Sequence, residues 1–174
     1  MLTIRPAAGD DVARIDVLLR SSFTAPAEAT LVRDLCINGD MVLTLVAVEA
    51  GDDALVGMVA FSRMAVTVHE KPVAAVALAP IAVVAAHRGQ GVEEALVQAG
   101  IDQLEAAGIV LCFVLGDPAF YERFGFDADF ARGFASPYAG DHLMALPLQG
   151  GLIPCGVRGA ATHAAAFARL GNAI

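Results

Sequence analysis

The stretch Ala79-Pro-Ile-Ala-Val-Val-Ala-Ala-His-Arg-Gly-Gln-Gly-Val-Glu-Glu-Ala-Leu96 decides the fold of this chain. It runs from an apolar strand through a glycine turn into a helix. The first amides of a helix have no acceptor within the helix and point outward at the positive end of its dipole, so such a turn is suited to hold an anion. Glu93 and Glu94 add two negative charges where that anion would sit.

The composition of the 174-residue chain is typical of one folded domain. Hydrophobic residues make up 57% of it and charged residues 17%, which allows a sizeable core. The formal net charge is -8, the sequence pI is about 4.8 and Lys and Arg form no cluster, so we expect no nucleic-acid partner. The longest uncharged run, residues 72–86, is too short to span a bilayer, and no secretory signal follows Met1. We therefore expect a cytoplasmic protein with no membrane partner.

The cysteines and histidines give no pattern of metal ligands. Cys36, Cys112 and Cys155 lie far apart without paired spacing, which is typical of buried free thiols. His87 and His163 also lack partners at ligand spacing, and we expect them at the surface or at helix caps. The sequence predicts no metal site.

Upstream of the glycine turn, the sequence predicts a strand, two helices and an antiparallel meander. The expected strands span residues 2–6, 41–49, 54–68 and 73–84. A first helix should run from about Asp10 to Phe23, and a second should span residues 27–37. The apolar face of the first helix is expected to contain Val12, Ile15, Leu18 and Leu19. Pro80 requires a bulge or a splayed end in the last strand, because proline donates no hydrogen bond to a ladder.

Downstream of the turn, a helix over residues 93–107 and a buried strand over residues 109–115 predict a right-handed parallel crossover. A short helix should follow over residues 117–124, with Asp117 as N-cap and Gly125 as the stop. Residues 143–148 read as one more strand. The segment from residue 150 onward is rich in Gly and Ala and predicts no defined element.

This order of elements resembles the GNAT N-acetyltransferase superfamily over roughly the first 150 residues. The acetyl-coenzyme A motif of that family is Arg or Gln, two residues, Gly, one residue, then Gly or Ala, and it falls on Arg88-Gly-Gln-Gly91-Val-Glu93, with only the last position departing. Asp117-Pro-Ala-Phe-Tyr121-Glu-Arg-Phe-Gly-Phe126 looks like a second landmark, a Tyr before a Phe-Gly-Phe turn. Pro137-Tyr138 and His142-Leu-Met-Ala-Leu146 are similar to the late strand of a bacterial branch of predicted small N-acetyltransferases.

The resemblance implies an α+β fold of the GNAT (acyl-CoA N-acyltransferase) type, with a mixed, mostly antiparallel central sheet flanked by helices. Residues 1–150 would form the acetyltransferase domain. Residues 151–174 would form a C-terminal extension packed on the same domain or on a partner subunit. Homodimers are common in the family, so a homodimer is a further expectation.

The resemblance also implies a reaction and a set of site residues. Acetyl would move by direct attack from the co-substrate acetyl-CoA to an amine of a small molecule or peptide. The backbone of Ile81, Ala82 and Val83 would bind the pantetheine arm, and Tyr121 would be the general acid that protonates the departing thiolate. The pyrophosphate would contact the turn residues, which are Arg88, Gly89, Gln90, Gly91, Val92 and Glu93.

Two questions stay open at the level of sequence. The general base is one of the titratable residues near predicted element ends, which are His69, Glu70, Asp117 and His142, or a chain of waters. Glu93 and Glu94 either complement the helix dipole and swing into solvent, or they repel the pyrophosphate. In the second case the chain would be a non-catalytic GNAT-fold binding or interaction module with weakened coenzyme A binding.

Overall fold

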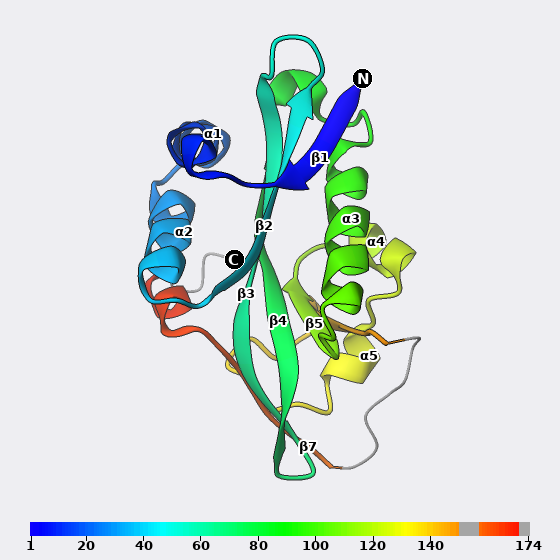
Figure 1. Ribbon diagram of the computed structural model, residues 1–174. Helices are drawn as coiled ribbons and strands as arrows, with labels where there is room; N and C mark the ends of the chain where they lie inside the picture. Colours follow the sequence, from blue (N-terminus) through cyan, green and yellow to red (C-terminus); the bar gives the residue numbers. More distant parts are fainter. Residues whose placement is uncertain (150–156, 171–174) are drawn as a thin grey trace.

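A single mixed sheet organises the molecule in the computed structural model, which describes residues 1–149 and 157–170 (Figure 1). In the described part the sheet has seven strands in the order β1-β2-β3-β4-β5-β6, and β7 pairs with β3. Neighbouring strands are antiparallel except β4 and β5, which run parallel. The predicted mixed, mostly antiparallel sheet is therefore confirmed. The strands are β1 (Leu2–Pro6), β2 (Met41–Glu49), β3 (Leu55–Val68), β4 (Lys71–Val83), β5 (Leu111–Leu115), β6 (Leu143–Pro147) and β7 (Arg158–His163).

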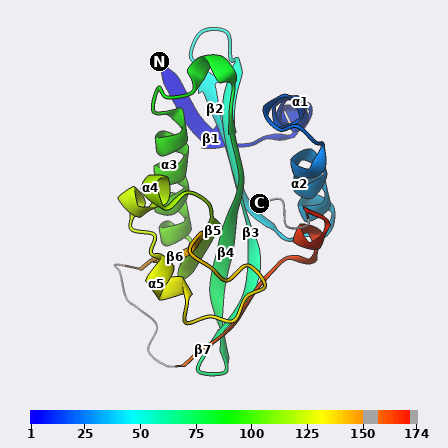
Figure 2. The same ribbon diagram turned by 180° about the vertical axis from the view of Figure 1, so that it is seen from behind.

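Helices cover both faces of the sheet (Figures 1 and 2). One face is covered by α1 and α2, and the other by α3. The α-helices are α1 (Val12–Ser22), α2 (Ala27–Ile37), α3 (Val92–Ala106), α4 (Pro118–Tyr121) and α5 (Ala128–Ala131). Short 3-10 helices are η1 (Gly9–Asp11), η2 (Ala85–His87), η3 (Glu122–Phe124) and η4 (Ala165–Leu170). The core accordingly lies in two layers, one on each side of the sheet.

The crossover from β4 through α3 to β5 forms as the sequence predicts. Leu96, Val97 and Ile101 of α3 pack into the core between the helix and the sheet. Gly100 brings the helix close to β3, because a Cβ at this position would overlap the ring of Phe61. This close contact fixes the distance of α3 from the sheet, and with it the position of the glycine turn at the N-terminus of the helix.

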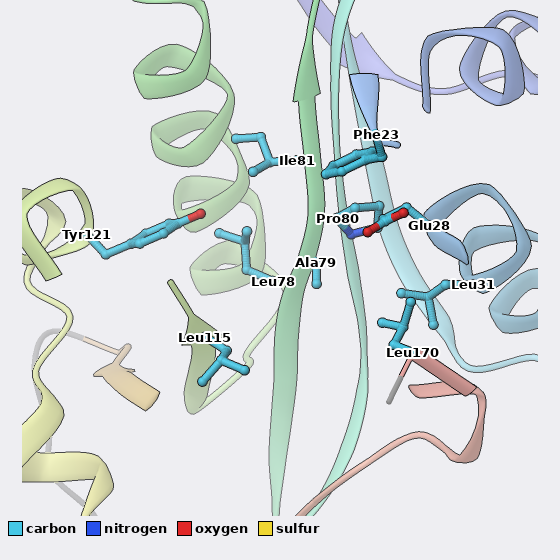
Figure 3. Close-up of a pocket in the computed structure, with 10 residues that line it drawn as sticks. All are labelled: Phe23, Glu28, Leu31, Leu78, Ala79, Pro80, Ile81, Leu115, Tyr121 and Leu170. Atoms are coloured by element: carbon cyan, nitrogen blue, oxygen red, sulfur yellow. The ribbon is translucent and has the colours of Figure 1, made fainter. Parts of the chain in front are cut away.

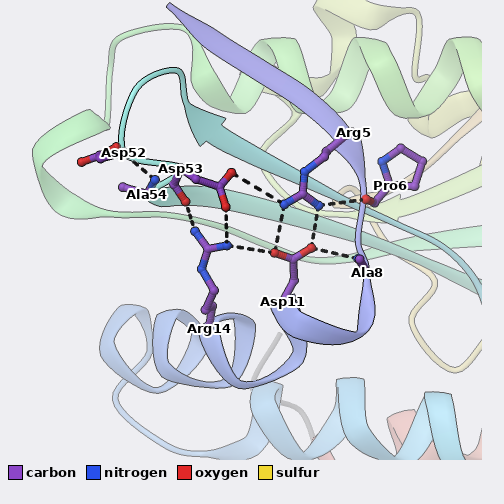
Figure 4. Close-up of polar contacts among 8 residues, drawn as sticks. All are labelled: Arg5, Pro6, Ala8, Asp11, Arg14, Asp52, Asp53 and Ala54. Carbon is purple, nitrogen blue, oxygen red and sulfur yellow. Dashed lines mark hydrogen bonds and ion pairs between the residues drawn. The ribbon is translucent and has the colours of Figure 1, made fainter.

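A buried carboxylate sets the start of α1 (Figure 4). Asp11 is 1% exposed and accepts hydrogen bonds from Arg5 at 2.6 Å, from the amide of Ala8 at 2.8 Å and from Arg14 at 3.1 Å. These bonds join β1, η1 and α1, and they hold the pKa of Asp11 down at about 2. The predicted apolar face of α1 is wrong at Val12, which is 66% exposed, because η1 precedes the helix and rotates its first residue toward solvent.

The edges of β3 and β4 show one confirmed feature and one that the sequence missed. Ala79 and Pro80 of β4 face a single residue of β3, so the predicted bulge at Pro80 is present. On its other edge β3 pairs first with β2 and then with β7. The strand β7 is rich in small residues and shows no apolar alternation. At Gly159 a small residue is required, because a Cβ there would overlap the side chain of Thr67.

Candidate functional site

The turn between η2 and α3 presents backbone amides that have no partner. Gly89 and Gly91 adopt φ angles of 71° and 81°, which favour glycine, and Gly91 caps α3 without a side-chain hydrogen bond. Among the described residues, the amides of residues 89–94 donate to no acceptor. Added Cβ atoms at both glycines would meet open space, so the backbone here is accessible to a ligand. The turn is therefore built as the sequence predicts, as a cradle of N–H groups at the positive end of a helix.

The polar side chains of the turn bind backbone or a neighbouring strand and leave the cradle uncovered. Arg88 donates from Nε to the carbonyl of Val83 at 3.1 Å, and Gln90 donates to the carbonyl of Ala86 at 2.8 Å. The ring of His87 contacts Glu49 on β2 at 2.9 Å, so this predicted surface histidine is partly buried. The terminal nitrogens of Arg88 have no partner within the described chain and remain available to an anion.

The two glutamates at the start of α3 differ in their surroundings. Glu94 forms an ion pair with Arg123 at 3.1 Å, so a cation from η3 compensates its charge. Glu93 has no such ion pair, and its charge acts on Tyr121 instead. The two acids that the sequence treats as equivalent therefore have different electrostatic roles.

The final residues of β4 have one unpaired edge. The strand β5 pairs with β4 only from Ala75 to Leu78, whereas β3 follows β4 to Val83. The amide of Val84 bonds to the carbonyl of Val56. Because bonded and non-bonded pairs alternate along an antiparallel ladder, Ile81 and Val83 direct their N–H and C=O groups to the open edge. Ala82 between them bonds to β3 and contributes a buried side chain.

A cavity of about 300 Å³ lies where β4 and β5 separate (Figure 3). Its walls come from the end of α1, from α2, β4, β5 and α4, and from η4. Tyr121 is 7% exposed, directs its hydroxyl toward Leu78 and Ile81, and makes no hydrogen bond with a described residue. The lining residues are Phe23, Glu28, Leu31, Leu78, Ala79, Pro80, Ile81, Leu115, Tyr121 and Leu170.

Burial controls the protonation of Tyr121. Burial, followed by the negative charge of Glu93, raises the pKa of Tyr121 to about 12. The phenol is therefore protonated throughout the neutral and mildly alkaline range. It can donate a proton to a nearby anion, and it has no competing partner in the cavity.

The four residues considered as general base lie outside this cavity. His69 and Glu70 form the turn between β3 and β4, at the opposite end of β4 from Val83. At about 3.3 Å per residue, the length of β4 places them roughly 40 Å from the open edge. Asp117 caps α4 through the amide of Ala119, and His142 contacts the carbonyl of Gly116. None of the four lines the cavity.

Glu28 of α2 is the ionisable residue of the cavity that sequence reasoning missed. It follows Pro26 in the first helical turn, where an acid is ordinarily explained by the helix dipole. Its side chain crosses from α2 toward β4, and its carboxylate lies beside Pro80 (Figure 3). No short motif signals this approach, because α2 and β4 meet only in the folded chain.

Of the described residues, the remaining histidine and cysteines singled out in the sequence lie outside the cavity. His163 lies between the rings of Tyr138 and Phe167, and burial lowers its pKa to about 4, so the expectation of a surface or capping residue is wrong. Cys112 is buried as expected, but Cys36 is exposed, and Cys155 lies outside the described residues.

In the described part of the chain no three His, Cys, Asp or Glu side chains gather as a metal site would require. Within the same part, no helix combines the length and apolarity needed to span a membrane.

Comparison with known proteins gives consistent matches. The family model described as acetyltransferase (GNAT) domain matches residues 3–128. The chain is 43% identical over 126 residues to the uncharacterized N-acetyltransferase YhbS of Escherichia coli K12, covering 72% of this chain and 74% of that protein. The crystal structure of Escherichia coli YhbS in complex with CoA has a TM-score of 0.88, at 35% identity, over 98% of this chain and 93% of that one. A GNAT family acetyltransferase from Brucella melitensis in complex with acetyl-CoA has a TM-score of 0.74, at 27% identity, over 96% and 98% of the two chains.

Proposed function

Because this chain belongs to the GNAT acetyltransferase family, we infer that it is an enzyme that moves acetyl from acetyl-CoA to the amine of a small molecule or peptide. The observation that carries the proposal is the order in which three features of the site follow one another. Unpaired amides of residues 89–94 lie at one end, the open edge at Ile81 and Val83 follows, and the hydroxyl of Tyr121 lies in the cavity at the other end. Acetyl-CoA carries a diphosphate, an amide-containing arm and a thioester in the same order.

The chain's groups fit each part of acetyl-CoA. Amides at the N-terminus of α3 suit the pyrophosphate, and the terminal nitrogens of Arg88 can add charge-assisted hydrogen bonds. The carbonyl of Val83 already accepts from Arg88, so its amide is the group left for the arm or the thioester carbonyl. Relatives crystallised with CoA and acetyl-CoA support acetyl-CoA as the co-substrate.

Tyr121 has the properties of the general acid. Bound acetyl-CoA would supply an activated acyl group and a thiolate leaving group. The phenol of Tyr121, whose pKa is about 12, is protonated at neutral pH. It would donate its proton to the sulfur as the C–S bond breaks, and would recover a proton from solvent. The amide of Val83 would hold the thioester oxygen while the amine attacks. The reaction forms an amide bond, frees coenzyme A as its thiol and releases one proton.

The ion pair between Glu94 and Arg123 favours the enzyme over a non-catalytic binding module. The module interpretation needs both acids to repel the pyrophosphate, and Arg123 compensates one of them at 3.1 Å. One uncompensated acid at about 6 Å from a phosphate costs about 0.7 kcal/mol in water and about 3 kcal/mol at an effective dielectric constant of 20. The cradle of amides and Arg88 can offset a cost of that size.

Calorimetric titration with acetyl-CoA tests the proposal. We expect micromolar binding and, with an accepted amine, release of coenzyme A. A Gly91→Val variant should lose binding, because a branched side chain both resists the φ angle of 81° and covers the amides. Absence of heat and of any thermal shift at millimolar acetyl-CoA would reject the enzyme and favour the module.

A further inference from the structure

The carboxylate of Glu28 is unsatisfied inside the cavity. Its Oε2 is buried and accepts no hydrogen bond from the described residues. Its Oε1 has no hydrogen-bond partner among these residues either. None of the other nine described lining residues carries a charge, so among them no cation compensates Glu28. Buried carboxylates are ordinarily paired or hydrogen-bonded, which makes this one a candidate ligand-binding group.

Glu28 and Tyr121 contribute to the same cavity from opposite sides of β4 (Figure 3). Tyr121 comes from α4 on the side of α3, and Glu28 comes from α2 on the other face of the sheet. The end of β4 lies between them. A thioester carbonyl held at the open edge would therefore have a proton donor on one side and a carboxylate on the other, which is the arrangement that acyl transfer to an amine requires.

We propose that Glu28 binds the ammonium group of the acceptor and accepts its proton, and that the acceptor is a primary amine attached to an apolar body. This assignment rests on the proposed function and names the acceptor class of the same site. The Glu28 carboxylate takes one proton from the ammonium, and the neutral amine then forms the C–N bond as the C–S bond breaks. Glu28 passes this first proton to solvent, its carboxylate then takes the second proton from the nitrogen and passes it to solvent as well, and Tyr121 protonates the sulfur.

The walls of the cavity define the apolar part of the acceptor. Phe23, Leu31 and Leu170 surround the Glu28 side of the cavity with hydrocarbon. The volume of about 300 Å³ has room for the acetyl group and a body of roughly one aromatic side chain. A carboxylate next to the amine would lie near Glu28 with no cation among the lining residues to receive it. We therefore expect amines, amino-acid amides or peptide N-termini to be accepted, and free amino acids to be rejected.

A direct binding experiment tests Glu28 without the reaction. Phenethylamine, phenylalanine and phenethyl alcohol share one apolar body and differ in charge. Calorimetric titrations of the protein without nucleotide should show phenethylamine binding about tenfold or more tightly than the other two, because a charge-assisted hydrogen bond accounts for a factor of about 10 to 100. Glu28→Gln should remove this preference while leaving phenethyl alcohol within about twofold.

Turnover and control variants complete the test. With acetyl-CoA and phenethylamine, Glu28→Gln should lower kcat by about 100-fold or more, and Glu28→Asp should restore part of it. The acetyl-CoA affinity of both variants should stay within about twofold of the wild type, since Glu28 lies away from the glycine turn. Glu70→Gln, an acid-to-amide change in the turn between β3 and β4, should leave phenethylamine binding, acetyl-CoA affinity and kcat unchanged.

The outcomes separate the two proposals. The Glu28 assignment is overturned if Glu28→Gln binds phenethylamine as the wild type does, if its turnover stays within twofold, or if phenylalanine is preferred. It is equally overturned if phenethylamine shows no binding at millimolar concentration. A wild type that binds phenethylamine through Glu28 but does not bind acetyl-CoA would reject the proposed transferase and keep the amine site.

Discussion

Tyr121 should ionise about two pH units later than an ordinary tyrosine, and the delay reports directly on the group assigned as general acid. The hydroxyl lies in the cavity at 7% exposure, and the Glu93 carboxylate adds a negative charge nearby. Both effects disfavour the phenolate, with burial the larger. They raise the pKa of Tyr121 from 10.0 to about 12.

The magnitude follows from that shift. Two pH units correspond to about 3 kcal/mol of additional free energy needed to ionise Tyr121 in the folded chain. Since the raised pKa belongs to the folded state, the folded chain retains a proton that the unfolded chain loses between about pH 10 and pH 12. The free energy of unfolding should therefore fall as the pH rises through this window, and Tyr121→Phe should flatten the decline.

The composition makes the assay simple. The chain contains two tyrosines and no tryptophan, so tyrosinate absorbance in the near ultraviolet comes from two groups. Subtracting the titration of Tyr121→Phe from that of the wild type isolates Tyr121. Circular dichroism recorded at each pH identifies the range in which the chain is folded.

Two variants check the cause of the delay. Glu93→Gln should move the midpoint back toward 10 without reaching it, because burial remains. Glu94→Gln should leave the midpoint unchanged, because Glu94 is engaged with Arg123. A folded wild type whose Tyr121 titrates at or below 10 would refute the reasoning and remove the basis for Tyr121 as a general acid that stays protonated at alkaline pH.

Three further predictions concern packing, pH and the cofactor turn. Gly100→Ala should lower the free energy of unfolding by about 1–3 kcal/mol in chemical denaturation, because the new Cβ would lie 2.5 Å from Cε2 of Phe61. A Phe61→Leu background should relieve the loss, and full stability of the single variant would contradict this packing. The lowered pKa of Asp11 should contribute about 2 kcal/mol to the free energy of unfolding, and this contribution is lost as the pH falls from about 4 to 2. If the same loss persists in melts of Asp11→Asn, Asp11 is not its source. Arg123→Gln should weaken acetyl-CoA binding about 3- to 100-fold in calorimetry, because the charge of Glu94 is then uncompensated, and adding Glu94→Gln to this variant should restore the affinity. An unaltered affinity in the single variant would show that the pair lies too far from the pyrophosphate.

The sequence predicts the glycine turn and the elements around it because their signals are local. Glycine spacing, the unpaired start of a helix and an amphipathic repeat all lie within residues 79–107, and each acts through the nearest turns of the chain. The bulge at Pro80 and the cap at Asp117 are local in the same way, and both are present. The distance between this turn and the cavity is then set by β4 itself.

The Glu28 side of the cavity, which we propose as the acceptor side, is not predicted because it depends on contacts between distant segments. Glu28 and Leu170 are more than a hundred residues apart in sequence, and each has an ordinary local explanation, as a dipole-complementing acid and as a terminal apolar anchor. The strand β7 escapes prediction for a related reason. Gly159 fits closely against Thr67 of β3, so at this position the residue type follows the partner strand and not the usual β preference.

The short helix η4 has a consequence for how this enzyme can diversify. It packs on α2, where Arg169 forms an ion pair with Asp34 at 2.7 Å, and Leu170 reaches the wall beside Glu28. In the proposed assignment, residues 81–93 bind acetyl-CoA, whereas η4 contributes to the wall of the acceptor side. If that assignment holds, substitutions in η4 would change which amine is accepted and leave acetyl-CoA binding unchanged.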